Sequence, residues 1–482
     1  MQDLMIWVEP CSRLLFVLAI GWFVMTNLQY FGYRFDRFLL HHTKPMWLIG
    51  YLITPVLLYY IGGNFFWLFF YALYIPTLFI WHKKLDRKLV LTARVKRFFT
   101  ILIISQIALE AAYYINGYNQ KKSILFGLFI SLAFSHIIES IIHAGYKKKA
   151  RRKLLTRPNL TVIALTASYG KTSIKEFLRQ MLSPRFSVYA TPGNVNTDLG
   201  ICADINDKLP DETEIYIVES GARQKGDILA IAELTQPQYI IIGKIGKQHI
   251  EYFKTIENIQ LTKKELLKSP RLEYAIVHSS AQAEPSEKLI ILDDYQIKNT
   301  IATLEGTAWD LTIDGKTFHL QTPVLGGFNA LNISLAFLLC RKLGVADESV
   351  IRQIALLKGA KHRLEPIKTP TKMILDDSYN GNLEGMLGAC DLAATWRGRK
   401  VIVTPGIVES DEESNVALAE KINAVFDLAL ITGAQNAVLL CDRIDRAKRK
   451  RIFDKRSLET ILAKETKTGD LILFANDAPS FI

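Results

Sequence analysis

A chain of 482 residues with 49% apolar residues and a mean hydropathy of +0.14 is too long for one ordinary domain and too apolar for a purely water-soluble enzyme. Its net charge of +12 lies at one end, because residues 1–153 carry 19 Lys+Arg against 6 Asp+Glu, whereas the remainder carries 40 against 41. The nearly neutral remainder lacks the basic field that draws proteins onto a phosphate backbone, which argues against nucleic-acid binding.

Five apolar runs near the N-terminus approach the roughly 20 residues that a helix needs to cross a membrane. They are Leu14–Tyr30, Met46–Ile61, Phe65–Trp81, Phe98–Tyr114 and Ile124–Ile142. The loops after the first, third and fifth runs are rich in Lys and Arg, and the two alternate loops are not. By the positive-inside rule, we expect a multi-pass inner-membrane protein with an external N-terminus and residues 154–482 in the cytoplasm. The basic loops also predict contact with anionic membrane lipid.

Four ionisable residues lie in or near these runs, namely Glu110, His136, Glu139 and His143. The last three are spaced i, i+3 and i+7, which places them on one face of a helix. The pattern is compatible with a metal or proton site, or with a helix-packing contact close to the cytoplasmic interface. We favour the packing contact and keep the functional site as the alternative.

A phosphate-binding loop is predicted where residues 159–182 change from an apolar strand to a loop and then a helix. Gly170 lets the backbone approach phosphates closely, Lys171 neutralises their charge and Thr172 can ligate Mg²⁺. The free N–H groups at the start of the helix add further donors. Leu165 occupies the first glycine position of the GxxxxGK[ST] spacing, so the match to that motif is partial.

Seven further motifs follow this loop in a fixed order. They are TPGNVNTDLG (191–200), EIYIVESGA (214–222), IIGKIGKQHIEYF (241–253), LTKKELL (261–267), GGFNALNISLA (326–336), HRLEPI (362–367) and LDDSYNGN (375–382). Together they resemble the Mur ligase family, and most closely its D-alanyl-D-alanine-adding branch, whose DDSYNAN and TPGNxNNDxG signatures correspond to DDSYNGN and TPGNVNTDLG. The resemblance extends from Asn159 to the C-terminus, about two thirds of the chain.

The resemblance implies an ATP-dependent carbon–nitrogen ligase of peptidoglycan synthesis, and hence a role in the cell wall, cell shape and cell division. Ligases of this kind phosphorylate a substrate carboxylate, and an amine then displaces phosphate from the acyl phosphate to leave an amide. The implied substrates are UDP-N-acetylmuramoyl-tripeptide and D-alanyl-D-alanine. A complex with other cell-wall enzymes is a further partner that this implies.

The resemblance also implies roles for individual residues. Lys171 would grip the γ-phosphate, and two Mg²⁺ ions would be held by Thr172, Glu219, His249 and a carbamylated Lys263. The implied ATP contacts are Ser168, Gly170, Lys171, Thr172, Ser173, Asn329, Asn332, Arg363, Asp377 and Tyr379, and those to the substrates are Asn194, Asn196, Thr197 and Asn380. Taken singly, Lys263 could equally be a solvated lysine beside Lys264; within seven ordered motifs the functional interpretation is favoured.

The sequence departs from the family pattern in four places. Ala167 replaces the glycine that usually opens the GxxGKT loop, and Phe328 replaces the histidine before Asn329. The C-terminus lacks the usual KGS ending, which puts some contacts to the amine substrate in doubt. The N-terminal domain that ordinarily holds the UDP end is missing, and the apolar segment stands in its place, so the reaction type is better defined than the substrate.

Strands and helices alternate through the rest of the chain, with a hairpin predicted to turn at Asp314–Gly315 and a second alternating unit beyond Ile367. The sequence therefore predicts an α-helical transmembrane segment (1–153), a P-loop ATPase-like central α/β domain (154–366) and a Rossmann-like C-terminal α/β domain (367–482). We expect ATP to bind between the last two.

Three other functions remain open at this point. A Mur-type ligase could act on a different or lipid-linked carboxylate, because a membrane anchor could substitute for the lost UDP-binding domain. A non-catalytic cell-wall scaffold is disfavoured by the retained Lys171, Thr172, Glu219, His249 and Lys263. A transporter driven by the ATPase part is disfavoured because the ligase motifs continue into the last domain.

Overall fold

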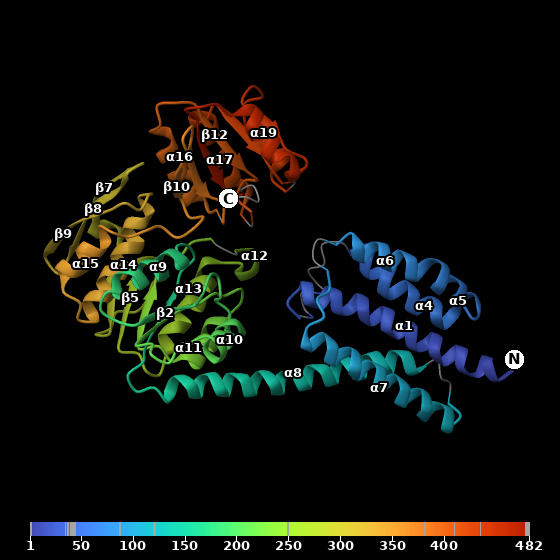
Figure 1. Cartoon of the computed structure of the whole chain (residues 1–482). Coiled ribbons are helices and arrows are strands. Elements are labelled where there is room, and N and C mark those ends of the chain that lie inside the picture. The colour runs from blue at the N-terminus through green and yellow to red at the C-terminus, as the bar shows by residue number, and fades with distance from the viewer. Residues whose placement is uncertain are drawn as a thin grey trace. The chain divides into compact units, whose positions relative to one another are not determined.

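The computed structural model describes residues 2–33, 35, 38, 45–85, 88–118, 122–247, 250–379, 381–408, 410–433 and 435–477 (Figure 1). The chain divides into two compact units, Met1–Gly145 and Tyr146–Ile482. The described part of the first unit is helical, and that of the second forms three β-sheets with surrounding helices.

Helices of very different lengths build the described part of the first unit. They are α1 Gln2–Tyr30, α3 Pro45–Leu48, α4 Thr54–Ile61, α5 Phe65–Phe69, α6 Ile75–Lys83, α7 Ala93–Ile115 and α8 Ser123–Leu155, which ends in the second unit. Turns of π-helix at Ile49–Ile53 and Phe70–Tyr74 join α3 to α4 and α5 to α6. Aromatic rings fill the core of this unit, where the ring centroid of Phe16 lies 4.9 Å from that of Phe66 and 5.4 Å from that of Phe70.

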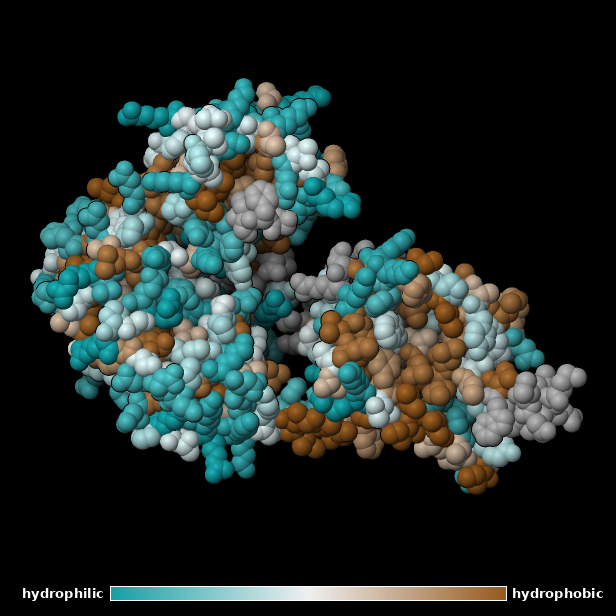
Figure 2. All heavy atoms as spheres, in the orientation of Figure 1, coloured by the Kyte–Doolittle hydropathy of each residue, from teal (hydrophilic) through white to brown (hydrophobic). Residues whose placement is uncertain are grey.

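The outward faces of these helices are strongly apolar. Ile61 and Ile115 are each 79% exposed, and Phe65 and Phe129 are each 72% exposed. Figure 2 shows brown, hydrophobic residues spread over this unit, whereas the surface of the second unit is mostly teal. Contiguous exposed apolar surface of this kind is typical of a protein that is not in contact with water there.

Within the described residues, four helices are long and apolar enough to cross a membrane, rather than the five expected from the sequence. They are Val8–Tyr30, Phe65–Lys83, Ala93–Ile115 and Ser123–Leu155. The remaining apolar helix, Met46–Ile61, is shorter because a turn at Gly62–Asn64, with Gly63 at a φ of +52°, ends it before it reaches spanning length.

The ionisable residues of the helical unit form ion pairs across its helices. The Glu110 carboxylate accepts hydrogen bonds from Arg13 Nε at 3.0 Å and from Ser123 Oγ at 2.6 Å. The Glu139 carboxylate accepts one from Arg97 Nε at 2.8 Å, and His143 Nε2 lies 3.9 Å from it. Arg97 is thus the main partner of Glu139, which agrees with the packing contact expected for this helix face.

The second unit begins with a parallel sheet of order β2-β3-β1-β4-β5-β6. Its strands are β1 Thr161–Thr166, β2 Val188–Ala190, β3 Ile215–Glu219, β4 Tyr239–Ile242, β5 Tyr274–His278 and β6 Leu289–Leu292. The helices around it are α9 Lys171–Leu182, α10 Asp198–Asp207, α11 Asp227–Thr235, α12 Ile250–Phe253, α13 Ile256–Lys264, α14 Phe328–Lys342 and α15 Asp347–Ile354. Apolar clusters lie on both faces, as a parallel sheet requires.

The order of the strands creates a natural binding site at one edge of this sheet. β1 lies between β3 and β4, so the chain leaves β1 and returns on either side of it. Ligands of open α/β sheets bind at such a switch point, outside the carboxyl ends of the strands. Thr166, Glu219 and Ile242 end these three strands and therefore border the site.

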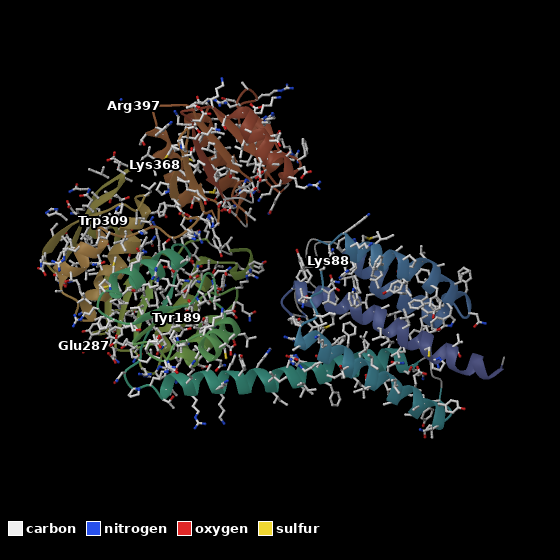
Figure 3. All side chains as sticks on the ribbon, in the orientation of Figure 1. Lys88, Tyr189, Glu287, Trp309, Lys368 and Arg397 are labelled. Atoms are coloured by element: carbon white, nitrogen blue, oxygen red, sulfur yellow. The ribbon has the colours of Figure 1, made fainter. Side chains whose placement is uncertain are left out.

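A small antiparallel sheet adjoins this core. Its strands are β7 Ile297–Thr303, β8 Gly306–Ile313 and β9 Lys316–Thr322, and the turn predicted at Asp314–Gly315 is confirmed between the last two. Trp309 of β8, labelled in Figure 3, is buried and donates from Nε1 to Ser334 Oγ of α14 at 3.0 Å. The small sheet is thereby attached to α14.

A second six-stranded sheet, of order β10-β11-β15-β12-β13-β14, forms the C-terminal part. Its strands are β10 Glu365–Lys368, β11 Met373–Asp377, β12 Lys400–Thr404, β13 Leu428–Ile431, β14 Arg449–Arg451 and β15 Leu471–Ala475, and its helices are α16 Leu383–Ala394, α17 Glu412–Val425, α18 Ala437–Arg443 and α19 Leu458–Glu465. β10 pairs antiparallel to β11, and the other pairs are parallel. The second alternating α/β unit predicted beyond Ile367 is therefore present.

The end of α8 belongs to the second unit. Ala150 and Leu154 are buried in the apolar cluster that covers one face of the central sheet. Tyr146 Oη donates to the Asp207 carboxylate of α10 at 2.8 Å, and Lys153 Nζ donates to Leu209 O at 3.0 Å. The last turns of α8 are thus part of this α/β core.

We expect a chain starting at Tyr146 to be more stable than one starting at Leu154 by about 2 kcal/mol. The shorter chain loses the buried Ala150 methyl, worth about 1 kcal/mol, and the hydrogen bonds of Tyr146 and Lys153, which together add about 1 kcal/mol. The urea midpoints of the two chains measure the difference, and Tyr146→Phe in the longer chain should show part of it. Equal midpoints would mean that residues 146–153 do not stabilise this unit.

Candidate active site

The predicted phosphate loop connects β1 to α9 at the switch point of the central sheet. Gly170, the residue before α9, has a φ of +76°, a left-handed conformation that favours glycine. A Cβ at this position would lie 2.5 Å from Asn332 Oδ1. Gly170 is therefore required both by its backbone conformation and by the close approach of Asn332.

Lys171 folds back over this loop. Its Nζ donates to Ala167 O at 2.8 Å and to Ser168 O at 3.1 Å. Burial lowers the pKa of Lys171 to about 8, with the charge of Glu219 opposing that shift. The ammonium thus lies within the loop, where a bound phosphate would find a positive charge.

Ala167 and Ser168 are both buried in the loop. A Cβ on Gly243 would lie 3.0 Å from the Ala167 methyl, so this side chain occupies space that Gly243 leaves open. Ser168 N donates to Lys244 O at 2.9 Å, and Ser168 Oγ donates to Gly246 O at 3.1 Å. The loop after β4 therefore supports the phosphate loop through its backbone.

Glu219, at the end of β3, is the centre of a buried polar cluster. Its Oε2 accepts a hydrogen bond from Thr172 Oγ1 at 3.1 Å and lies 3.0 Å from Lys175 Nζ. Its Oε1 accepts one from Asn196 Nδ2 at 3.2 Å. The structure therefore brings together Thr172, Glu219 and Asn196, three of the residues singled out in the sequence.

Lys263, near the end of α13, is only 3% exposed. Burial lowers its pKa well below the usual range; the charge of Lys171 lowers it further, whereas Asp227 and Glu219 oppose the shift. Lys263 therefore shares the electrostatic environment of the phosphate loop. Lys264 differs, because its Nζ donates to Gln282 O at the surface.

Of the predicted substrate contacts, Asn196 lies in the cluster around Glu219, whereas Thr197 lies at the start of α10. Thr197 Oγ1 caps α10 by accepting from Gly200 N at 3.3 Å, and Asn194 is exposed. Ser173 is buried in α9. His249 and Asn380 lie outside the described residues.

Two asparagines of α14 face the phosphate loop. Asn332 Nδ2 donates to Asn329 Oδ1 at 3.1 Å, and Asn329 Nδ2 donates to Leu325 O at 2.8 Å. These bonds hold the Asn332 amide beside Gly170. Phe328, which precedes them, packs instead against the apolar cluster of the C-terminal sheet.

Arg363, Asp377 and Tyr379 lie together where the chain enters the C-terminal sheet. The Arg363 guanidinium stacks 4.4 Å from the centroid of the Tyr379 ring. Burial raises the pKa of Asp377 to about 6, while the charge of Arg363 opposes that rise. Burial also lowers the pKa of Arg363, with the charge of Asp377 as the main opposing effect.

His362, which the sequence analysis did not single out, joins this region to β11. Its Nδ1 lies 2.6 Å from Asp376 Oδ2, and its backbone N donates to Glu365 Oε2 at 3.2 Å. His362, Glu365 and Asp376 are close enough to hold a metal ion. The hydrogen bond between His362 and Asp376 accounts for their proximity.

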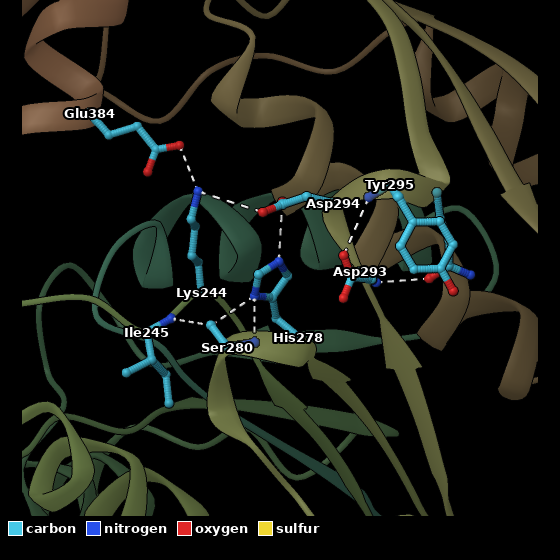
Figure 4. A network of polar contacts seen from close by, with 9 residues as sticks. Lys244, Ile245, His278, Ser280, Asp293, Asp294, Tyr295 and Glu384 are labelled. Carbon is cyan, nitrogen blue, oxygen red and sulfur yellow. Dashed lines mark hydrogen bonds and ion pairs between the residues drawn. The ribbon is translucent and has the colours of Figure 1, made fainter.

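Lys244 and Lys247, in the loop after β4, form ion pairs with the C-terminal part. Lys244 Nζ lies 2.8 Å from Glu384 Oε1 and 4.0 Å from Asp294 Oδ2 (Figure 4). Lys247 Nζ lies 3.3 Å from the carboxylate of Asp411, which caps α17. The loop that supports the phosphate loop is thus also attached to α16 and α17.

His278 and Ser280 extend this network into the central sheet. His278 Nε2 lies 3.2 Å from Asp294 Oδ1, and His278 Nδ1 lies 2.7 Å from Ser280 Oγ. Ser280 Oγ in turn accepts a hydrogen bond from Ile245 N at 2.8 Å (Figure 4). These contacts attach the loop after β4 to residues 278–280, at the end of β5.

In Lys244→Glu, repulsion from Glu384 replaces an attraction of up to about 1 kcal/mol, so the loop that supports the phosphate loop is less firmly attached to α16. We therefore expect this variant to raise the KM for ATP about threefold to tenfold. Steady-state kinetics measure this effect, and adding Glu384→Lys should reverse most of it. Lys298→Glu, on the exposed edge of β7, is the matched control. An unchanged KM in Lys244→Glu would mean that the ion pair has no role in nucleotide binding.

The chain is similar to proteins of known function. The family model described as "Mur ligase middle domain" matches residues 165–340. The UDP-N-acetylmuramoyl-tripeptide–D-alanyl-D-alanine ligase of Bacillus subtilis is 26% identical over 333 residues, 65% of this chain and 72% of that protein. The Escherichia coli ligase of the same name is 28% identical over 294 residues, 57% of this chain and 65% of its own length.

A solved structure is similar over the same region. The crystal structure of the MurF ligase from Thermotoga maritima in complex with ADP superimposes with a TM-score of 0.61 at 26% identity. The match covers 70% of this chain and 80% of that one.

Proposed function

We propose, because this chain belongs to the Mur ligase family, that it is an ATP-dependent ligase that joins D-alanyl-D-alanine to UDP-N-acetylmuramoyl-tripeptide. The observation that supports this most strongly is the cluster of Lys171, Thr172, Glu219 and Lys263 around the phosphate loop. A buried carboxylate, a hydroxyl and two amines converge there at the carboxyl ends of parallel strands.

The reaction proceeds in two steps. An oxygen of the substrate carboxylate bonds to the γ-phosphorus of ATP, the bridging O–P bond breaks and ADP leaves. The amine nitrogen of D-alanyl-D-alanine then bonds to the acyl carbon, phosphate leaves with its oxygen, and the nitrogen loses a proton. Lys171 neutralises charge on the transferring phosphoryl group, and Arg363 adds a second cation close enough for its charge to add to burial in lowering the pKa of Lys171.

The donor chemistry of the cluster fits Mg²⁺. Thr172 Oγ1 and Glu219 Oε2 are neighbouring oxygen donors, the kind that Mg²⁺ prefers, and we propose that they hold one ion. His249 and Lys263 would hold a second. When bound, the ions neutralise charge on the phosphates.

We propose that Lys263 becomes a metal ligand by carbamylation. Burial lowers the pKa of Lys263 well below its usual range, which favours the unprotonated amine, the form that bonds to the carbon of CO₂. The nitrogen then loses a proton, and the carbamate that forms is an anionic oxygen donor.

We also propose that the helical unit is a multi-pass anchor in the inner membrane that contacts anionic lipid. Its apolar outer surface and the Lys and Arg of its alternate loops support this placement, with the ATP-binding part in the cytoplasm. The C-terminal part would act as a Rossmann-like domain that closes over ATP bound to the central domain. The ion pairs of Lys244 and Lys247 support that closure.

A lipid-linked carboxylate is the second candidate substrate, since a membrane anchor would keep the enzyme next to a substrate held in lipid. Full-length protein in detergent, with ATP, D-alanyl-D-alanine and either the UDP-tripeptide or its polyprenyl-linked form, distinguishes the two. We expect a product mass for the UDP form. Turnover of the polyprenyl form alone would transfer the proposal to the second candidate, and no product from either would contradict the ligase assignment.

A further inference from the structure

The side chain of Lys175, on α9, is fully buried. Lys175 lies one helical turn after Lys171, and its side chain is 0% exposed. Its neighbours Ile174, Phe177 and Leu178 are buried apolar residues of the same helix. Burying an ammonium is costly unless it is paired, so a lysine retained here needs specific partners.

The partners of Lys175 both belong to the candidate active site. Its Nζ lies 3.0 Å from Glu219 Oε2 and donates to Gly193 O at 2.6 Å. Glu219 ends β3, and Gly193 belongs to the loop between β2 and α10. One ammonium therefore connects the helix of the phosphate loop with a predicted metal ligand and with a predicted substrate loop.

The loop between β2 and α10 is also attached to Glu219 by other bonds. Glu219 N donates to Thr191 Oγ1 at 3.1 Å, and Asn196 Nδ2 donates to Glu219 Oε1 at 3.2 Å. Gly221 N donates to Asn196 O at 2.7 Å. Gly193 has a left-handed φ of +52°, and Lys175 stabilises this turn by donating a hydrogen bond to the Gly193 carbonyl.

We propose that Lys175 is a positioning residue that holds the Glu219 carboxylate and the loop 191–197 in one fixed arrangement. The proposal rests on the proposed function, in which this loop holds the carboxylate substrate and Glu219 holds a metal ion. Phosphoryl transfer from ATP to a carboxylate depends on the relative position of those two groups. Lys175 joins them without contacting substrate.

The test is Lys175→Met, which keeps the length of the side chain and removes its charge. We expect the amide hydrogens of residues 191–197 to exchange about tenfold faster, because the bond to Gly193 is lost. We also expect Mn²⁺, used as an electron-paramagnetic probe of the metal site, to bind about tenfold more weakly. The KM for the carboxylate substrate should rise more than the KM for ATP.

Arg179→Met is the matched control, since Arg179 lies on the same helix, is 44% exposed and pairs only locally with Glu176. It should leave hydrogen exchange, Mn²⁺ binding and kinetics unchanged. Neither hydrogen exchange nor Mn²⁺ binding requires the substrate to be known. Hydrogen exchange requires no metal site either, so failure of the proposed function would leave that readout intact.

The double variant Lys175→Met/Glu219→Gln separates positioning from stability. Removing both members of a buried pair costs much less than removing one, so the double variant should regain thermal stability relative to Lys175→Met. Exchange in residues 191–197 should remain fast. If the double variant also restores slow exchange, or if Lys175→Met leaves exchange and Mn²⁺ binding unchanged, the proposal is wrong.

Discussion

Lys171→Ala is expected to lower the rate of ATP-dependent ligation by about 10³-fold or more while the protein stays folded. The ammonium lies against the Ala167 and Ser168 carbonyls at the start of α9, where the transferring phosphate would bind. Loss of a cation that stabilises a phosphoryl-transfer transition state has an effect of this size. Single-turnover kinetics with full-length protein in detergent measure the rate of the chemical step.

Lys208→Ala is the control for this prediction, because Lys208 is an exposed lysine at the end of α10. It should ligate at the wild-type rate. Circular dichroism and the melting temperature should match among the three proteins. Wild-type turnover in Lys171→Ala would contradict the placement of ATP at this loop.

Lys263→Ala is expected to lower ligation by about 10²-fold or more, a loss that added bicarbonate does not restore. The buried Lys263 side chain is where a carbamate would form, and removing it removes a predicted metal ligand. Full-length wild-type protein incubated with ¹³C-bicarbonate should show a carbamate resonance that the variant lacks. This measurement does not depend on which carboxylate is the substrate.

The adjacent Lys264 provides a matched control. Its Nζ donates to Gln282 O near the surface, and Lys264→Ala should keep both the carbamate resonance and the activity. Normal Mg²⁺-dependent turnover in Lys263→Ala would contradict the proposed carbamate but not the phosphate loop. If both variants lost activity equally, a loss of stability in α13 would be the explanation.

The amino-acid sequence by itself determined the features that depend on neighbouring residues. The phosphate loop lies between β1 and α9 because an apolar strand, a glycine and a helix start follow one another within residues 161–182. The hairpin at Asp314–Gly315 was equally predictable, since its turn chemistry is local. The apolar helices of the first unit follow from composition.

The helix limits were less predictable. Met46–Ile61 falls short of spanning length because a turn at Gly62–Asn64 ends it, whereas α8 continues beyond the last apolar run into the second unit. A helix continues where its next turn can be packed, and the burial of Ala150 against the central sheet depends on residues more than 50 positions away. The residues next to Ala150 in the sequence therefore do not predict that contact.

Only the tertiary structure added charged residues that the sequence motifs did not indicate. In the sequence, Lys175 resembles any other lysine of an amphipathic helix. Its spacing of four residues from Lys171 is the only local indication that it belongs to the site. Its role depends on Glu219 and Gly193, which strand order brings to the same edge of the sheet. The nearer partner of Lys244, Glu384, likewise comes from α16, 140 residues later. Ion pairs of this kind are set by the packing of distant elements, because a charge is buried only where folding supplies its partner.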